Sequence, residues 1–170
     1  MLFLLFFTSI TFGANESAYD KGVIAFDSGN YEKAIEFLTD ASNQDDARAQ
    51  VKLGVMYNRG QGVTQNYKKA FELFTLAAKQ DNAQAKSALG MSYMQGQGVT
   101  QDYQQAVKWF TFAAEEGHAL GQYTLGFMYE NGRGVTQNHK QAVKFYTLAA
   151  EQGQQDAQAN LGDMYGSGRG

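Results

Sequence analysis

The sequence predicts an all-α solenoid that is built from antiparallel helical hairpins. A motif of the form L-G-x-x-Y recurs every 36 residues, and its four copies begin at Leu53, Leu89, Leu125 and Leu161. A fixed period of about 20 to 50 residues is typical of one supersecondary unit that stacks on its own copies. Within each copy the alanines and large apolar residues recur at i, i+4, i+7 and i+8, which places them on one side of a helix. Each copy is therefore expected to form two short amphipathic helices.

The N-terminal segment has the character of a secretory signal peptide. Residues 1–7 are almost wholly apolar, and small residues follow as far as Ala14. This order predicts a signal peptide over residues 1–14, with cleavage near Gly13 or Ala14. The apolar run is shorter than the roughly 20 residues of a membrane-spanning helix, and no cysteine follows it to carry a lipid. We expect a periplasmic or secreted protein whose mature chain is not inserted in a membrane.

Residues 15–170 are predicted to form a single repeat domain. The first unit is short because it lacks the G-x-G-V segment of the later copies and turns at Ser28-Gly29-Asn30. The last unit supplies a first helix and the start of a turn. In chain order, the predicted units are 16–45, 46–81, 82–117, 118–153 and the partial unit 154–170.

The two helices of each full unit are expected to approach each other closely. Gly54, Gly90 and Gly126 recur at the same place in the first helix, where a side chain would push the second helix away. We expect Leu53 and Phe74 to be the large partners in the same contact.

The G-x-G-V segments that begin at Gly60, Gly96 and Gly132 are predicted to be turns between the two helices. Glycine there supplies a positive φ. A phosphate-binding loop is excluded, because no strand precedes the segment and no third glycine follows it.

Caps are predicted at both ends of the second helices. Side chains suited to an N-cap stand at Asn66, Asp102 and Asn138, with Gln105 and Gln141 placed to complete two capping boxes. At the C-terminal ends, left-handed caps are expected at Gly117, Gly153, Asp45 and Asp81.

The composition excludes several functional classes. A net charge of -3 and an isoelectric point near 5.3 provide no basic field for nucleic acid. The absence of cysteine excludes disulfides, thiolate nucleophiles and cysteine-based metal sites. We expect no metal and no cofactor, and the partner that we expect is a protein or a peptide.

Units two to four resemble the Sel1-like repeats, which are bacterial and eukaryotic relatives of the tetratricopeptide repeats. Their pattern A…LG..Y..G.GV….A..W…AA..G is matched here by Leu125-Gly126, Tyr129, Gly132, Gly134-Val135, Ala142, Ala149-Ala150 and Gly153. Trp109 occupies the aromatic position in the third unit, and the first unit resembles an ordinary tetratricopeptide repeat. The resemblance covers about residues 16–170. It implies a right-handed superhelix that binds a peptide or protein on a concave face lined by the first helices.

Positions that differ between the copies are free to specify a ligand. Val55, Met91 and Phe127 form an apolar strip along the inward-facing columns that the resemblance assigns. Methionine and aromatic side chains are suited to such a surface, although the same side chains could simply pack on neighbouring helices. We expect Met91→Asp with Phe127→Asp to abolish partner capture. The predicted partner-binding residues are Val55, Asn58, Arg59, Met91, Met94, Gln95, Tyr123, Phe127 and Glu130.

Two other functional classes are weighed against this one. A hydrolase would need a base at neutral pH, and the two histidines, His118 and His139, stand in columns that we interpret as tolerant surface positions. We therefore assign no catalytic residue. An envelope protein that binds carbohydrate or peptidoglycan is the alternative, and its one hint is a pair of tyrosines, Tyr67 and Tyr103, which we expect to be exposed on successive second helices.

Overall fold

The computed structural model describes residues 16–169, so the predicted signal peptide at 1–14 lies outside the described residues. Between residues 16 and 169 the chain forms nine helices. They are α1 (Ala18–Asp27), α2 (Tyr31–Asn43), α3 (Ala47–Arg59), α4 (Tyr67–Ala78), α5 (Ala83–Gln95), α6 (Tyr103–Glu115), α7 (Ala119–Asn131), α8 (His139–Glu151) and α9 (Gln155–Gly166).

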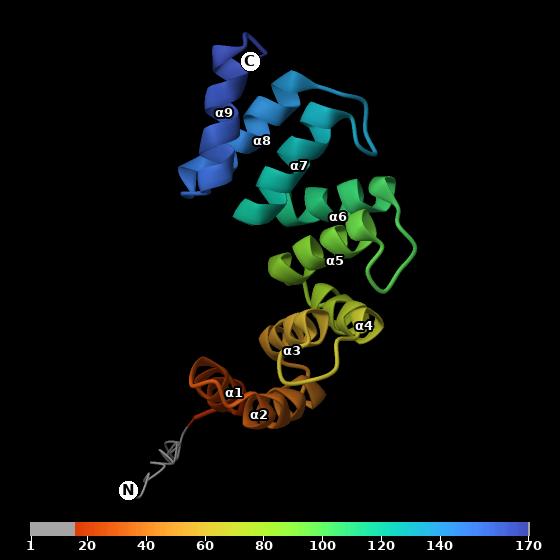
Figure 1. Ribbon diagram of the computed structural model, residues 1–170, viewed down its shortest axis with the longest axis vertical. Coiled ribbons are helices and arrows are strands. Elements are labelled where there is room, and N and C mark those ends of the chain that lie inside the picture. The colour runs from red at the N-terminus through yellow and green to blue at the C-terminus, as the bar shows by residue number, and fades with distance from the viewer. Residues whose placement is uncertain (1–15, 170) are drawn as a thin grey trace, which may run out of the picture.

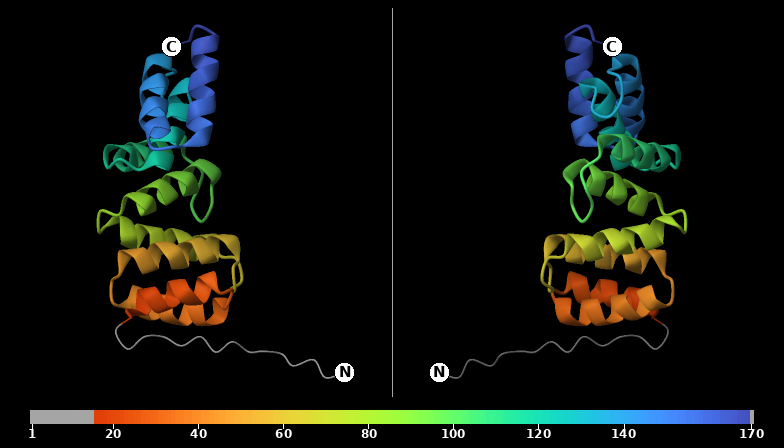
Figure 2. Two further views of the ribbon diagram at one scale, coloured as in Figure 1. Left: turned by 90° about the vertical axis from the view of Figure 1, so that its left-hand side faces the viewer. Right: turned by 90° about the vertical axis from the view of Figure 1, so that its right-hand side faces the viewer.

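Consecutive helices pack as hairpins, and the hairpins stack into a curved solenoid (Figure 1). The pairs are α1 with α2, α3 with α4, α5 with α6, and α7 with α8, and α9 is the first helix of a fifth unit. The helix axes turn steadily along the stack, from lying across its long axis at α1 to lying along it at α9 (Figure 2). The predicted all-α repeat solenoid is confirmed. None of the described helices is long and apolar enough to cross a membrane.

The close contact within each unit is made by a glycine and an aromatic ring. A Cβ atom added at Gly54 would lie 2.6 Å from Cε1 of Phe74, and one added at Gly90 would lie 2.8 Å from Cδ1 of Phe110. Tyr146 supplies the ring in the next unit. Leu53 packs with residues of the first unit, in a different core cluster from Phe74, so our expected pairing of Leu53 with Phe74 is wrong.

The predicted turns and caps are largely confirmed. Both glycines of each G-x-G-V turn have a positive φ, and so do the predicted left-handed caps at Gly117, Gly153, Asp45 and Asp81. The N-cap side chains accept hydrogen bonds from backbone N–H groups, as predicted for Asn66, Asp102 and Asn138.

The two predicted capping boxes are wrong, because the backbone N–H of each N-cap residue already donates to a carbonyl oxygen of the first helix. The N–H of Asp102 donates to the carbonyl oxygen of Tyr93 at 2.9 Å, so the side chain of Gln105 has no donor left to meet there. The equivalent bond, from the N–H of Asn138 to the carbonyl oxygen of Tyr129, explains why Gln141 does not complete a capping box. In both units this hydrogen bond ties the first helix directly to the start of the second.

A part-buried polar contact also joins the first helix of each full unit to a residue that follows the second helix. Its first member lies in the first helix and its second member follows the second helix, 30 residues further on. The three pairs are Gln50 with Gln80, Lys86 with Glu116, and Gln122 with Gln152.

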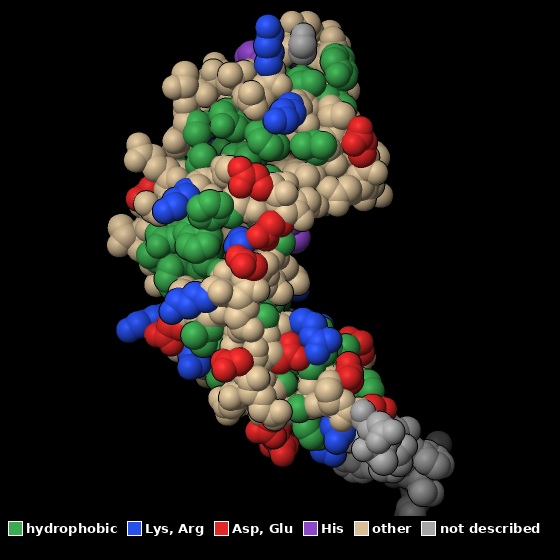
Figure 3. Space-filling view, turned by 180° about the vertical axis from the view of Figure 1, so that it is seen from behind, with side chains coloured by type: hydrophobic (Ala, Val, Ile, Leu, Met, Phe, Trp, Pro, Cys, Tyr) green, Lys and Arg blue, Asp and Glu red, His purple; other side chains and the backbone are tan. Residues whose placement is uncertain are grey.

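The outer side of the solenoid carries a repeated apolar position. Leu76, Phe112 and Leu148 are spaced by 36 residues on α4, α6 and α8, and they are 44%, 38% and 36% exposed. Seen from behind, hydrophobic side chains gather above mid-height, in the half of the molecule that holds the C-terminal units (Figure 3).

Candidate binding groove

Two hollows lie side by side on the surface formed by the first helices. One, of about 430 Å³, lies between α1 and α3 and reaches the start of α5. The other, of about 260 Å³, lies between α3 and α5 and reaches the start of α7. They share four lining residues, which are Val51, Val55, Arg59 and Gln84. The hollows therefore form one groove, and the outline of the molecule is indented at mid-height (Figure 3).

The predicted residues of the second unit divide between the groove and a structural contact. Val55 and Arg59 lie where the two hollows meet. Arg59 is exposed, and no carboxylate of the described residues pairs with it. Asn58 lines the second hollow, but its Nδ2 donates to Oε1 of Gln97 at 3.1 Å.

In the third unit, two of the three predicted residues line the groove. Met91 and Gln95 both face the second hollow. Met94 is half-buried and packs against the cluster that contains Phe110 and Leu125. Its role is in the core between α5, α6 and α7.

The predicted residues of the fourth unit do not line either hollow. Tyr123 and Phe127 pack against the cluster around Tyr146, and the guanidinium of Arg133 lies 5.3 Å from the centre of the Phe127 ring. The proposed strip of Val55, Met91 and Phe127 is therefore interrupted after Met91.

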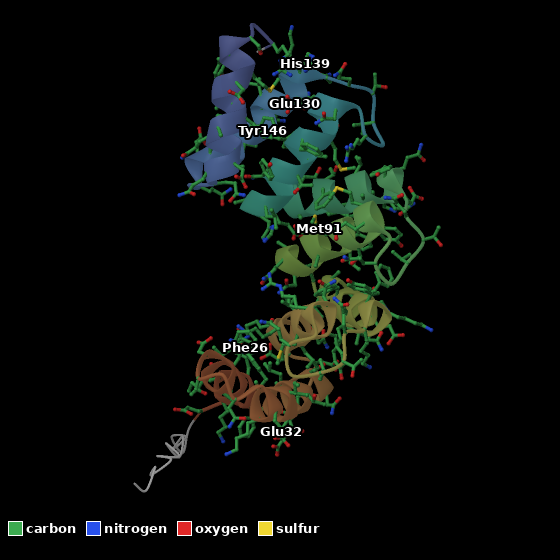
Figure 4. All side chains as sticks on the ribbon, in the orientation of Figure 1. Phe26, Glu32, Met91, Glu130, His139 and Tyr146 are labelled. Carbon is green, nitrogen blue, oxygen red and sulfur yellow. The ribbon has the colours of Figure 1, made fainter. Side chains whose placement is uncertain are left out.

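Glu130 belongs to a hydrogen-bonded network. Its Oε2 accepts from the hydroxyl of Tyr146 at 2.7 Å, and its Oε1 pairs with Arg169 at 3.0 Å. Asn160 donates to the same hydroxyl at 3.1 Å. Burial, together with the bond to Glu130, raises the pKa of Tyr146 well above its usual value. Figure 4 shows Glu130 and Tyr146 close together among α7, α8 and α9, well away from Met91.

Two of these structural contacts link neighbouring units at the same spacing. Asn58 meets Gln97, and Glu130 meets Arg169, each pair separated by 39 residues. The middle residue of the next G-x-G turn thus reaches back to the end of the preceding first helix. The end of a first helix is consequently a joint between units as well as part of the inner surface.

Sequence reasoning missed several residues of the groove. Tyr19, Phe26 and Lys52 line the first hollow, and Lys52 lies with its Nζ 3.9 Å from the centre of the Phe26 ring. Leu120, which stands at an inward-facing position of the sequence but is not one of the predicted partner-binding residues, lies in the second hollow and is 42% exposed. One signal was available, because Lys52 lies one helical turn after Arg48 on the face of α3 that contains Arg59.

The histidine columns are structural positions rather than tolerant surface. His118 is the N-cap of α7, and its Nδ1 accepts from the N–H of Gly121 at 3.2 Å. Asp46 and Asn82 cap α3 and α5 in the same way. Burial lowers the pKa of His118. Our interpretation of this column as free to vary is therefore wrong for α3, α5 and α7, where the side chain supplies the capping acceptor. Gln154, the equivalent residue before α9, makes no such hydrogen bond.

The tyrosines that hinted at carbohydrate binding are half-buried, not exposed as expected. A side chain at Gly98 would meet the backbone of Tyr67, and one at Gly134 would meet Tyr103, so the turn of the following unit lies over each tyrosine. His139 occupies the equivalent position in α8 (Figure 4). Among the described residues, no group of three histidine or acidic side chains is arranged to hold a metal ion.

Replacing His118 with asparagine should make the protein less sensitive to mild acid. Protonation would turn the capping Nδ1 into a donor beside the positive end of α7. In the folded protein the pKa of His118 is below the ordinary 6.5. The contribution of His118 to stability is therefore present above pH 6.5, and it is lost as the pH falls through the pKa that His118 has in the folded state. Since an N-cap contributes about 1 kcal/mol, the urea midpoint should fall further on acidification in the native protein than in His118→Asn. An equal fall in both proteins would contradict this role.

The comparisons with known proteins agree with this architecture. The Sel1 repeat family model matches residues 14–46, 47–82, 83–118, 119–154 and 155–170. No curated protein matches the sequence.

Several solved structures are similar to the chain. A Sel1 repeat protein from Oxalobacter formigenes is 35% identical, with a TM-score of 0.80 over 88% of this chain and 61% of its own. The protective antigen c5321 of uropathogenic Escherichia coli, which displays an SLR fold, is 32% identical, with a TM-score of 0.80 over 89% of this chain and 34% of its own. This chain therefore spans less than two thirds of the length of either protein.

Helicobacter pylori cysteine rich protein B is also similar, at 27% identity and a TM-score of 0.61, over 76% of this chain and 93% of its own. The present sequence contains no cysteine, so it differs in this respect from a protein that is described as cysteine rich. The family model covers nearly the whole sequence, and the glycine, aromatic and turn positions recur in the structure as the repeat requires. The chain belongs to the Sel1 repeat family.

Proposed function

We propose that this protein is a non-enzymatic scaffold that binds a peptide or a protein segment in the groove over α1, α3, α5 and the start of α7. The observation that carries the proposal is the continuity of the two hollows, because together they offer an elongated site with apolar side chains on its floor. An elongated apolar surface with polar residues at its edges is typical of peptide recognition.

The pattern of variation between the units supports this proposal. The glycine and aromatic positions that join the two helices are kept from unit to unit. The groove positions change, for example from Arg48 to Gln84 to Leu120 along one column. A constant skeleton with a variable lining lets one fold present different chemistry at each unit.

Replacing Met91 and Leu120 with glutamine should abolish partner capture while leaving the fold intact. Both side chains line the second hollow, and glutamine keeps a similar length and a good helix propensity. Leu120 takes the place of Phe127 in this pair because Phe127 lines neither hollow, whereas Leu120 lines the second one and is 42% exposed. Crosslinked pull-down from the envelope fraction of the source cell, followed by mass spectrometry, is the measurement.

The matched control is Leu76→Gln with Leu148→Gln on the outer side. Leu76 and Leu148 are 44% and 36% exposed, Leu120 is 42% exposed and Met91 is half-buried, so the control removes at least as large an exposed fraction of apolar side chain from residues that line neither hollow. Circular dichroism and thermal melting confirm that both variants are folded. Partner capture that survives in the groove variant, or is lost only in the control, would show that the partner does not use this groove.

We also propose that the protein is exported to the periplasm or secreted. The apolar run at residues 1–7 and the small residues up to Ala14 support this. N-terminal sequencing of the protein recovered from the periplasm or the medium tests it, and retention in the cytoplasm would exclude it.

A further inference from the structure

We infer that the ligand of the groove is an extended acidic segment, with acidic side chains over α3 and apolar side chains over α5 and the start of α7. This inference rests on the proposed function and names the chemistry that the groove selects. Charge complementarity in the groove carries it.

Three cationic side chains follow one face of α3. Arg48, Lys52 and Arg59 are separated by four and seven residues, which places them in line on a helix, and all three line the first hollow. At 1.5 Å per residue they extend over about 16 Å. The equivalent positions of α5 are Gln84, Ala88 and Gln95, and those of α7 are Leu120, Thr124 and Asn131. The cationic line is therefore specific to the second unit.

Two of these three charges are uncompensated. The guanidinium of Arg48 is already bound by Asp46, with Nε to Oδ1 at 3.1 Å and NH2 to Oδ2 at 2.6 Å. Lys52 lies over the ring of Phe26, and neither it nor Arg59 forms an ion pair with any described residue. On a chain with a net charge of -3, these two side chains provide a local attraction for anions.

The apolar part of the groove lies directly beside the cations. Arg59 borders both hollows, and the second hollow continues past Val55 to Met91 and Leu120. A ligand that reaches both parts must carry acidic and apolar side chains within a short length.

The spacing favours acidic side chains over a single terminal carboxylate. Lys52 and Arg59 are about 10 Å apart along the helix axis, which an extended chain covers in about three residues. One terminal carboxylate would satisfy one of the two cations. Two acidic side chains about three residues apart would satisfy both.

Selection from a displayed library of random 12-residue peptides tests this inference. The purified protein should select peptides enriched in Asp and Glu together with aliphatic residues, and Lys52→Gln with Arg59→Gln should select peptides without the acidic enrichment. For a defined selected peptide, this double variant should bind about tenfold more weakly at low ionic strength. The difference should shrink when salt is added, because exposed charges are screened.

The matched control is Lys108→Gln with Lys144→Gln, which removes the same charge from outside the groove. Each of these lysines also lies over an aromatic ring, Phe112 and Phe145 respectively. The control should keep both the acidic enrichment and the affinity. A control that weakens binding as much as the groove variant would show a general effect of net charge and overturn the inference.

The outcomes separate this inference from the proposed function. Selected peptides without acidic enrichment, whose binding is lost in Met91→Gln with Leu120→Gln, would overturn the acidic ligand and leave the groove as a peptide site. Binding that disappears when the C-terminus of the peptide is amidated would assign the cations to a terminal carboxylate and also overturn it. Failure to select any peptide would count against both proposals.

Discussion

Replacing Phe110 with alanine should lower the free energy of unfolding by about 3–5 kcal/mol. The ring is fully buried, and it packs on the backbone of α5 at Gly90. Its removal leaves a cavity at the joint between α5 and α6 that neighbouring side chains fill only in part. The effect should appear as a lower urea midpoint with an unchanged dependence on denaturant.

The pairing of a glycine with a ring can be tested by exchanging the two sizes. Gly90→Leu alone should be destabilising by about 1–3 kcal/mol. Its Cβ would lie 2.8 Å from the ring of Phe110, which is fully buried and therefore cannot move aside into solvent. Combined with Phe110→Ala, the leucine enters the space that the ring has left. The double variant should then be more stable than the sum of the single effects predicts, by about 1–3 kcal/mol.

Gly162→Leu is the matched control for the exchange. Gly162 is the equivalent glycine of α9, and a Cβ there would meet nothing within 4 Å. The substitution should therefore be neutral or slightly stabilising, since leucine has the better helix propensity. Strict additivity in the double variant, or equal damage from Gly90→Leu and Gly162→Leu, would show that the glycine and the ring do not form the contact.

The positions that repeat in every unit could be predicted, because comparing the copies separates them from the positions that vary. A fixed period of 36 residues shows which glycines and alanines every unit needs. The same comparison identified the left-handed caps, including the non-glycine residues Asp45 and Asp81, whose φ angles are 61° and 59°. These features depend on contacts inside one unit, so each copy needs the same residue type at the same position.

The groove was only partly predictable, because it depends on contacts between units. Equivalent residues of successive first helices were expected to share one environment. Asn58 lines the second hollow, but the equivalent Met94 packs on a core cluster and the equivalent Glu130 is bound by Tyr146 and Arg169. The contribution of α1 through Tyr19 and Phe26 was missed as well. The first unit lacks the repeat motif, so its columns could not be aligned with the others.

The second large effect is expected at the contact between the buried Lys86 and Glu116 in the third unit. Lys86 is 8% exposed, and its Nζ donates to Glu116 and to Asp81, whose side chain is 89% exposed. Glu116→Ala would leave the ammonium with the exposed carboxylate alone. Because breaking a buried pair leaves a charge uncompensated, we expect a loss of about 2 kcal/mol, less than for a fully enclosed pair since Glu116 is itself one third exposed.

Neutral pH is the condition at which this loss is fully expressed. Burial works against the charged form of Lys86, but the bonds to Glu116 and Asp81 outweigh it and raise its pKa above the ordinary 10.5. A raised pKa in the folded state means that the stabilisation is complete below pH 10.5 and is lost as the pH rises through the folded value. Urea unfolding at pH 7 therefore measures the intact pair.

The other units show what should replace the pair without loss. Gln80 donates to Gln50 at 2.9 Å, and Gln152 donates to Gln122 at 2.7 Å, so two amides satisfy each other at this position in the second and fourth units. Gln122 also donates to the carbonyl oxygen of Ala114, a bond that a lysine at position 86 does not make in its own unit. Lys86→Gln with Glu116→Gln should therefore match the native protein to within about 0.5 kcal/mol, because a neutral pair avoids the desolvation of two charges. A double variant as unstable as Glu116→Ala would mean that the third unit needs the charges themselves, and that its surroundings differ from those of its neighbours.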